Sequence, residues 1–206
     1  MLKRGFDAVV SIAGLTLLIP LMAVIALAIL LTDGPPVLFR QRRIGLKGRP
    51  FLLNKFRSMR SAPNAEAGSF DAGQTVRVTA LGRILRKIKL DELPQLWNVL
   101  IADMSLVGPR PEVERWVAAD PDRWARVLTV RPGITDPASI LYRYEEDILA
   151  DTVDPNEAYR TAILPHKLDI YIDYVNNQNF WRDITILIQT MSAVLSPSKP
   201  PRVPVD

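Results

Sequence analysis

Two adjacent carboxylates, Asp91 and Glu92, stand in the stretch KLDELPQLWNVLIADMSLVGPRPE, residues 89–112. A carboxylate can act as a nucleophile towards phosphorus. A carboxylate pair can also hold Mg²⁺, which prefers one or two carboxylates together with substrate phosphates, and a second carboxylate can move a proton. The pair therefore indicates phosphoryl-transfer chemistry.

Basic residues that suit phosphate binding occur in short motifs elsewhere in the chain. These are Lys55 and Arg57 in NKFRSM, Arg110 in GPRP and Arg131 in RPGIT. Glycine and proline restrict the loops beside the arginines, and guanidinium groups bind phosphate oxygens through paired hydrogen bonds. Together with the acid pair, these residues describe a phosphoryl-transfer site.

The acid pair also has an ordinary structural interpretation. Proline is tolerated in the first turn of a helix, so Pro94 predicts a helix that begins around residues 91 to 94. Acids near such a start are stabilised by the helix dipole, by about 0.3–1 kcal/mol. Residue chemistry alone leaves the structural and the catalytic interpretation open.

A long apolar run precedes these motifs. No charged residue occurs between Asp7 and Asp33, and a straight helix of that length, rising about 1.5 Å per residue, crosses a bilayer core of about 30 Å. Pro20 lies in the middle and is expected to kink the helix. Basic residues flank both ends, and the positive-inside rule keeps such flanks in the cytoplasm. A re-entrant hairpin satisfies both flanks, whereas a kinked span is the ordinary reading of a proline in a membrane helix.

A third interpretation of the run is a cleaved signal peptide. Ala26-Leu27-Ala28 resembles a cleavage site, but the apolar run continues through Ile29, Leu30 and Leu31, where a polar region is expected. The sequence therefore disfavours cleavage and leaves the span and the hairpin equally open.

Composition excludes several classes of protein. With 206 residues, 48% of them hydrophobic, the chain suffices for one domain with a core. It has no cysteine and one histidine, His166, which excludes disulfides, thiolate metal sites and multi-histidine metal sites. Residues 1–60 carry a net charge of +8 and the remainder −4. A basic flank beside an apolar segment indicates a membrane surface rather than nucleic acid, for which no recognition motif is present.

The remaining pattern predicts the elements that position these residues. Residues 36–59 read as two extended runs around a Leu-Lys-Gly-Arg turn, which predicts a β-hairpin. Residues 61–75 read as a mobile loop, and the proline-rich residues 196–206 as an extended tail.

Two amphipathic helices are also predicted. Apolar residues at helical spacing between Leu81 and Ile88 predict one, whose basic side chains face solvent, anionic lipid or phosphate. Residues 176–195 predict another, either packed in the core or lying on a membrane surface.

Taken in order, these motifs resemble the monotopic bacterial phosphoglycosyl transferases, the bacterial sugar transferase family. The resemblance covers nearly the whole chain. It rests on the blocks KRGFD, VLFRQRRIG, NKFRSM, LDELPQLWNVL, SLVGPRP, VRPGIT and LDIYIDYVNNQNFWRDITIL.

The resemblance implies transfer of a sugar phosphate from a UDP-sugar to polyprenyl (undecaprenyl) phosphate, with release of UMP. Asp91 would be the nucleophile and would carry a covalent phosphosugar. Glu92 would assist proton handling, and both acids would hold Mg²⁺. Lys55, Arg110 and Arg131 fall on motif positions that are expected to bind phosphate oxygens.

The resemblance also implies a fold. We expect an α+β, mostly helical protein with a re-entrant membrane helix in residues 1–35, a catalytic domain in residues 36–195 that contains the small β-hairpin and amphipathic interfacial helices, and the tail in residues 196–206. The catalytic domain would face the cytoplasm from the bacterial inner membrane.

The chain departs from the family pattern at two places. The usual Ser-Pro break of the membrane helix is Ile19-Pro20 here. The segment after RPGIT reads DPASILYRYEED, with Asp136-Pro137 at a usual glycine, and it supplies Arg143. We include Arg143 and Arg57 among the expected substrate-binding residues, and we expect the identity of the sugar to depend on this segment.

The expected partners are a UDP-sugar donor, the polyprenyl phosphate acceptor and membrane lipid, without nucleic acid. A homodimer is one assembly that the sequence leaves open. A different class of function, a non-catalytic membrane scaffold that recruits later glycosyltransferases, stays as the alternative; an intact acid pair with phosphate-binding loops argues against it.

Overall fold

The computed structural model describes residues 2–60, 77–150 and 152–195, so the predicted loop (61–75) and tail (196–206) lie outside the described residues. The strands are β1 (Leu38–Ile44), β2 (Pro50–Phe56), β3 (Ser105–Val107) and β4 (Gly133–Thr135). The helices are α1 (Leu2–Asp33), α2 (Ala80–Lys87), α3 (Gln95–Leu100), α4 (Glu114–Ala118), α5 (Pro121–Val127), α6 (Pro137–Leu141), α7 (Glu145–Ala150), α8 (Pro155–Ala158), α9 (Leu164–Asn177) and α10 (Phe180–Leu195). Short helical turns lie at η1 (Leu46–Gly48), η4 (Leu90–Glu92) and η5 (Tyr159–Ile163).

The predicted hairpin is confirmed. β1 and β2 pair antiparallel, from Leu38 opposite Phe56 to Ile44 opposite Pro50. The chain reverses where Lys47 and Gly48 adopt positive φ angles of 56° and 74°, a conformation that glycine adopts without steric cost. The Leu-Lys-Gly-Arg signal therefore marks the turn correctly.

A second, parallel pair of short strands was not predicted. Ser105 of β3 lies opposite Gly133 of β4, and Val107 opposite Thr135. The backbone of Gly108, the residue after β3, passes very close to Gly133 in β4. A Cβ on Gly133 would lie 2.1 Å from the amide nitrogen of Gly108. This contact explains why both GPRP and RPGIT are bordered by glycine.

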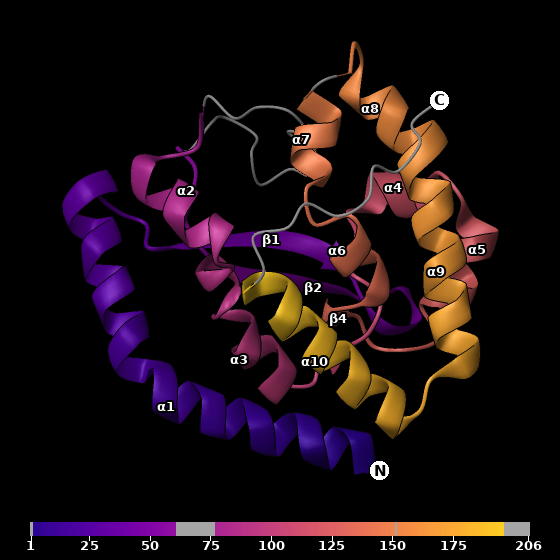
Figure 1. Cartoon of the computed structure of the whole chain (residues 1–206), viewed down its shortest axis with the longest axis horizontal. Coiled ribbons are helices and arrows are strands. Elements are labelled where there is room, and N and C mark those ends of the chain that lie inside the picture. Colours follow the sequence, from indigo (N-terminus) through magenta and orange to yellow (C-terminus); the bar gives the residue numbers. More distant parts are fainter. Residues whose placement is uncertain (1, 61–76, 151, 196–206) are drawn as a thin grey trace.

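Helix α1 is the only helix among the described residues that is long and apolar enough to cross a membrane; its most apolar window has a mean hydropathy of 2.7. Figure 1 shows α1 bending about halfway along its length. Pro20 lies inside the helix, and its ring and missing N–H account for a bend there. The N-terminal half runs alongside α3, where Gly14 faces Leu96.

The other helices build the core beside the hairpin. One cluster of buried side chains joins α4, α5, η5 and α9, and contains Trp124, Tyr159 and Tyr171. A second joins β2, α3, β3, α9 and α10. In Figure 1, α9 and α5 lie on one side of β1 and β2, and α1 lies on the other. The chain is thus mostly helical with a small two-stranded sheet and an apolar N-terminal helix, as expected.

Helices form at both segments for which amphipathic helices were predicted, and they differ in how far their apolar side chains are buried. Thr79 caps α2 by accepting a hydrogen bond from the amide of Gly82 (2.9 Å). Only Leu85 of its expected apolar face is buried, while Ile84 and Ile88 are exposed. Helix α10 buries Ile186 and leaves much of its apolar surface exposed, so a core-packing role accounts for only one of its faces.

Candidate active site

The acid pair lies in η4, a tight turn between α2 and α3. Helix α2 ends before Lys89, whose φ of 59° turns the chain into η4. Helix α3 starts only at Gln95, so the acids precede the helix instead of lying in its first turn as predicted. Asp91 and Glu92 are 6% and 8% exposed, which makes a purely solvated role untenable for both.

Glu92 is clamped by two cations. Its Oε1 accepts hydrogen bonds from Lys55 Nζ at 3.0 Å and from Arg110 Nη2 at 2.8 Å. Burial by itself would raise the pKa of Glu92, but Arg110 and Lys55 outweigh it and hold that pKa well below its usual range. The Glu92 carboxylate in turn raises the pKa of Arg110, so both groups are charged at neutral pH.

Asp91 differs from its neighbour because one of its oxygens has no partner. Its buried Oδ1 makes no hydrogen bond within the described residues. Burial raises the pKa of Asp91, and the Glu92 charge adds to this effect, whereas Lys55 opposes it. Beside a carboxylate that two cations hold through one oxygen, the structure thus places a second carboxylate whose Oδ1 is free to bind.

Arg86 is a cation near the acid pair that the sequence did not single out. Its positive charge lowers the pKa of Asp91, although less than Lys55 does. Burial lowers the pKa of Arg86 itself, and the Asp91 and Glu92 charges oppose that shift. Its side chain forms an ion pair with Glu146 of α7. The sequence feature that could have identified Arg86 is its position in the basic run that directly precedes Asp91 and Glu92.

The structure brings together some of the predicted substrate-binding residues and not others. Lys55 and Arg110 meet at Glu92. Arg57 instead donates to the carbonyl groups at the C-terminal end of α1, including Asp33 (2.8 Å) and Pro35 (2.7 Å). Its predicted contact with substrate stays a prediction, while its observed contact holds the end of α1.

Arg131 and Arg143 also make contacts away from the acids. Arg131 Nε donates to the carbonyl of Ala102 at 2.8 Å. The guanidinium of Arg143 lies 5.4 Å from the ring centre of Tyr144 and donates to the carbonyl of Val194 at 3.3 Å. Phosphate binding by these two arginines therefore stays a prediction.

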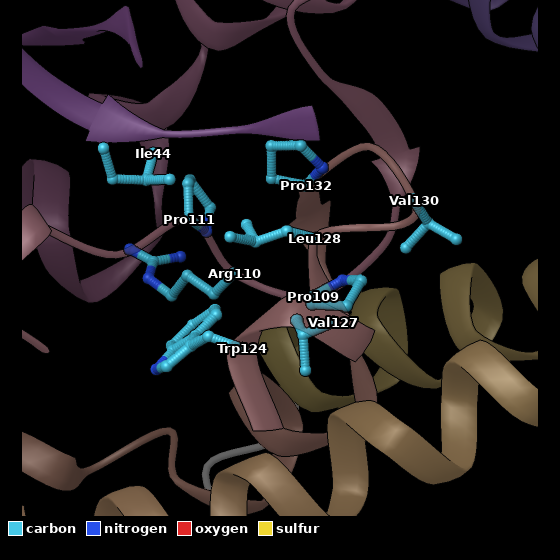
Figure 2. A pocket seen from close by; sticks show the side chains of 9 residues that line it. All are labelled: Ile44, Pro109, Arg110, Pro111, Trp124, Val127, Leu128, Val130 and Pro132. Carbon is cyan, nitrogen blue, oxygen red and sulfur yellow. The ribbon is translucent and has the colours of Figure 1, made fainter. Parts of the chain in front are cut away.

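A small cavity lies behind the loop that carries Arg110 (Figure 2). Its walls are mostly apolar and come from the residues Ile44, Pro109, Arg110, Pro111, Trp124, Val127, Leu128, Val130 and Pro132. It offers about 10 Å³ to the centre of a water molecule, room for about one water and not for a nucleotide sugar. The cavity belongs to the packing behind the loop.

A free carboxylate oxygen beside clustered cations is the arrangement of a candidate phosphoryl-transfer site, and comparison with known proteins agrees with it. Residues 1–197 match the family model described as "Bacterial sugar transferase". The chain belongs to the bacterial sugar transferase family, as the resemblance indicated, and hence to a family of enzymes.

Three relatives show how the similarity is distributed. The chain is 35% identical over 202 residues to UDP-N-acetylgalactosamine-undecaprenyl-phosphate N-acetylgalactosaminephosphotransferase of Aeromonas hydrophila, covering 95% of this chain and 44% of that protein. It is 36% identical over 197 residues to UDP-glucose:undecaprenyl-phosphate glucose-1-phosphate transferase of Caulobacter vibrioides, covering 94% and 70%. It is 35% identical over 195 residues to the uncharacterized sugar transferase EpsL of Bacillus subtilis, covering 95% and 88%.

Proposed function

We propose that the chain is a phosphoglycosyl transferase that moves a sugar-1-phosphate from a UDP-sugar to undecaprenyl phosphate. The observation that carries this proposal is the unpartnered Asp91 oxygen next to Glu92, which two cations hold ionised. The names of two relatives support it, since each names an undecaprenyl-phosphate sugar phosphotransferase, one for N-acetylgalactosamine and one for glucose. This would be the first membrane step of glycoconjugate assembly.

The first half of the reaction uses Asp91 as nucleophile. Its carboxylate oxygen forms a bond to the phosphorus that bears the sugar. The bond from that phosphorus to the UMP oxygen breaks, and UMP leaves with the electron pair. Lys55 and Arg110, which bond to the neighbouring Glu92, would neutralise charge on the transferring phosphate.

The second half returns the enzyme to its starting state. An oxygen of undecaprenyl phosphate attacks the phosphorus of the aspartyl phosphosugar, and the bond between that phosphorus and Asp91 breaks. The product is a polyprenyl diphosphosugar, and the Asp91 carboxylate is regenerated. Proton handling by Glu92 stays a prediction, because a carboxyl with a lowered pKa suits a permanent clamp better than a proton store.

The acid pair fits a role in holding Mg²⁺. The Asp91 Oδ1 is buried and unpartnered, and an anionic oxygen is the kind of ligand that Mg²⁺ prefers. No cluster of three or more metal-binding side chains occurs in residues 2–60, 77–150 and 152–195, so phosphate oxygens of the donor would complete the ligand set. Mg²⁺ would supply charge neutralisation at the phosphates. Asp91 and Glu92 are the residues that would hold it.

We infer a re-entrant path for α1, which the contacts at its two ends support. Near its start, Arg4 donates to the carbonyls of Val99 (2.5 Å) and Leu100 (2.7 Å) in α3. At its other end, Arg57 holds the carbonyl of Asp33. Both ends therefore contact the same compact domain, which a helix spanning a bilayer from face to face could not do. This supports a hairpin that enters the membrane and returns.

Exposed apolar side chains also support a helix α1 that enters one side of the membrane and returns. Large apolar residues of α1 are exposed along its length, among them Val9, Leu17, Val24 and Leu31. Exposed apolar residues of α2, α3 and α10 add to them: Ile84, Ile88, Trp97, Ile101, Trp181, Ile188, Met191 and Leu195. Such a surface suits insertion into one leaflet. We place the site at the cytoplasmic face of the inner membrane, where the lipid acceptor arrives within the membrane plane.

Release of UMP by the purified chain in detergent tests the proposed function. We would supply a panel of UDP-sugars with Mg²⁺, with and without undecaprenyl phosphate. The proposal predicts one stoichiometric burst of UMP without acceptor and continuous release with it, and the active donor identifies the sugar. Absence of UMP from every donor would contradict it and favour the scaffold.

A further inference from the structure

The backbone that carries Arg110 is held on both sides. The carbonyl of Pro109 accepts a hydrogen bond from the amide of Gly133 at 3.0 Å. The carbonyl of Pro111 accepts one from Arg43 Nη1 at 3.1 Å. These two bonds come from β4 and β1, and the third support of the loop is β3, which leads directly into it.

Side chains of α1 bind every residue of β3. Asp7 Oδ2 accepts a hydrogen bond from Ser105 Oγ at 2.8 Å, and Asp7 Oδ1 accepts one from the amide of Leu106 at 3.3 Å. Lys3 Nζ donates to the carbonyl of Val107 at 2.9 Å. The strand that delivers Arg110 is thus bonded to the helix that we place in the membrane.

Asp7 is an unusual residue for this position. It is 3% exposed, at the start of a strongly apolar helix, and burying a carboxylate is costly unless its hydrogen bonds are satisfied. Both of its oxygens accept hydrogen bonds from β3, and within the described residues neither oxygen bonds to the acid pair. The described contacts of its carboxylate are therefore directed at the strand before Arg110.

We propose that Asp7 is a positioning residue: by fixing β3 it sets the position of Arg110 at Glu92. The inference rests on the proposed function. Arg110 follows Val107 by three residues, so a shift of β3 moves the guanidinium directly. A displacement of about 1 Å at a reacting group can lower a rate about a hundredfold.

The other end of α1 shows a parallel arrangement. Arg57, which binds the carbonyls at the end of α1, follows Lys55 of β2 by two residues. Each of the two cations that clamp Glu92 therefore lies on a segment tied to α1. The membrane helix in this way supports the active site as well as anchoring it.

Three substitutions separate positioning from general stability. Asp7→Ala leaves the Ser105 hydroxyl and the Leu106 amide without their acceptor. Asp7→Asn keeps the shape, because the amide oxygen can accept from Leu106 N–H and the amide nitrogen can donate to Ser105 Oγ. Ser11→Ala is the matched control: Ser11 is fully buried one turn further along α1, and its hydroxyl makes no hydrogen bond within the described residues.

The first experiment measures hydrogen exchange on the full chain in lipid nanodiscs. The peptide covering residues 105–112 is compared with the hairpin, residues 38–56. We expect Asp7→Ala to accelerate exchange in 105–112 and not in the hairpin, while Asp7→Asn and Ser11→Ala match wild type. Unchanged exchange in 105–112 would overturn the proposal whatever the activity.

The second experiment measures UMP turnover with the donor that wild type uses. We expect Asp7→Ala to fall about tenfold to a hundredfold, with Asp7→Asn and Ser11→Ala close to wild type. Adding Asp7→Ala to Arg110→Lys should cost much less than it costs alone, since both changes act on one guanidinium. Fully additive losses, or a loosened loop with normal turnover, would overturn the inference. A wild type that releases no UMP would instead refute the proposed function, and the exchange comparison would still decide how the loop is held.

Discussion

Glu92 and Glu112 are two buried glutamates paired with arginine, and their surroundings differ in one respect. Glu112 has both oxygens occupied, since Oε1 accepts from Tyr159 (2.6 Å) and Oε2 from Arg43 (3.1 Å). Glu92 is bonded through Oε1 to Lys55 and Arg110 and stands next to an acid with an unpartnered oxygen.

A buried ion pair alone therefore does not mark a catalytic site. The Glu112 group is a closed network that joins β1 to η5, and nothing in it is left to bind a substrate phosphate. The Glu92 group holds two cations around a carboxylate that has free bonding capacity. We therefore assign structural stabilisation to Glu112 and catalysis to the pair Asp91-Glu92.

The largest effect in this comparison is expected for Glu92→Gln. Loss of the charge leaves the partly buried Lys55 and Arg110 without the carboxylate that they share, which costs about 3 kcal/mol of folding free energy. It also releases both cations from their positions, and we expect UMP turnover to fall by about a hundredfold or more. Urea unfolding and UMP release measure the two effects. Normal turnover in a folded variant would break the assignment.

A smaller effect, on stability alone, is expected for Glu112→Gln. The neutral amide can still accept from Tyr159 but leaves Arg43 without its charged partner, so we expect a loss of about 1–3 kcal/mol. Turnover per folded molecule should stay within about threefold of wild type, because the amide of Gly133 still holds the Arg110 loop when Arg43 loses its charged partner. A hundredfold loss of turnover at full folding would remove the distinction between the two glutamates.

Tyr159→Phe should have a still smaller effect. It removes the hydroxyl that donates to Glu112 and keeps the ring that packs against Trp116 at 4.9 Å between ring centres. We expect a loss of about 1–2 kcal/mol, typical of a hydrogen bond to a charged group. Thermal unfolding beside Glu112→Gln measures it. A Tyr159→Phe loss that exceeds the Glu112→Gln loss would show that the Tyr159 hydroxyl, and not the carboxylate, organises this network.

The dependence of stability on pH sharpens the comparison further. The pKa of Glu92 is lowered in the folded chain, so its ionised form contributes stability that is present above the pKa of an unfolded glutamate, about 4.3. That contribution is lost as pH falls through the lowered pKa. The stability difference between wild type and Glu92→Gln should therefore be constant from about pH 5 to 8 and shrink in more acidic solution. A difference that grows on acidification would contradict the ionised clamp.

Part of this architecture was predictable from local sequence. The Leu-Lys-Gly-Arg turn specified the hairpin, because glycine at positive φ and alternating flanks are local signals. Lys55 and Arg110 were expected to bind phosphate oxygens, which stays a prediction, and the structure places both side chains at Glu92. The motif glycines at 108 and 133 were read only as restricting the arginine loops, whereas the structure shows that their backbones contact each other closely.

The remaining features depend on contacts between distant segments. The parallel pairing of β3 with β4 joins three-residue strands that are too short for a periodic signal. The bonds from Asp7 to β3 link residues nearly a hundred positions apart. Arg57 was predicted to bind substrate, and in the structure it donates to carbonyls at the C-terminal end of α1. The last carbonyls of a helix need hydrogen-bond donors, and sequence alone cannot say which residue supplies them.

The measurement that tests the account most directly is trapping of the aspartyl phosphosugar. Purified wild type and Asp91→Asn would be incubated with the active UDP-sugar and Mg²⁺ without undecaprenyl phosphate, and their intact masses and peptides determined. The account predicts a phosphosugar adduct on Asp91 in wild type, matched by one equivalent of UMP and discharged when the lipid phosphate is added, and no adduct in Asp91→Asn. UMP release only in the presence of acceptor, without an adduct, or full turnover by Asp91→Asn, would contradict the nucleophilic role of Asp91.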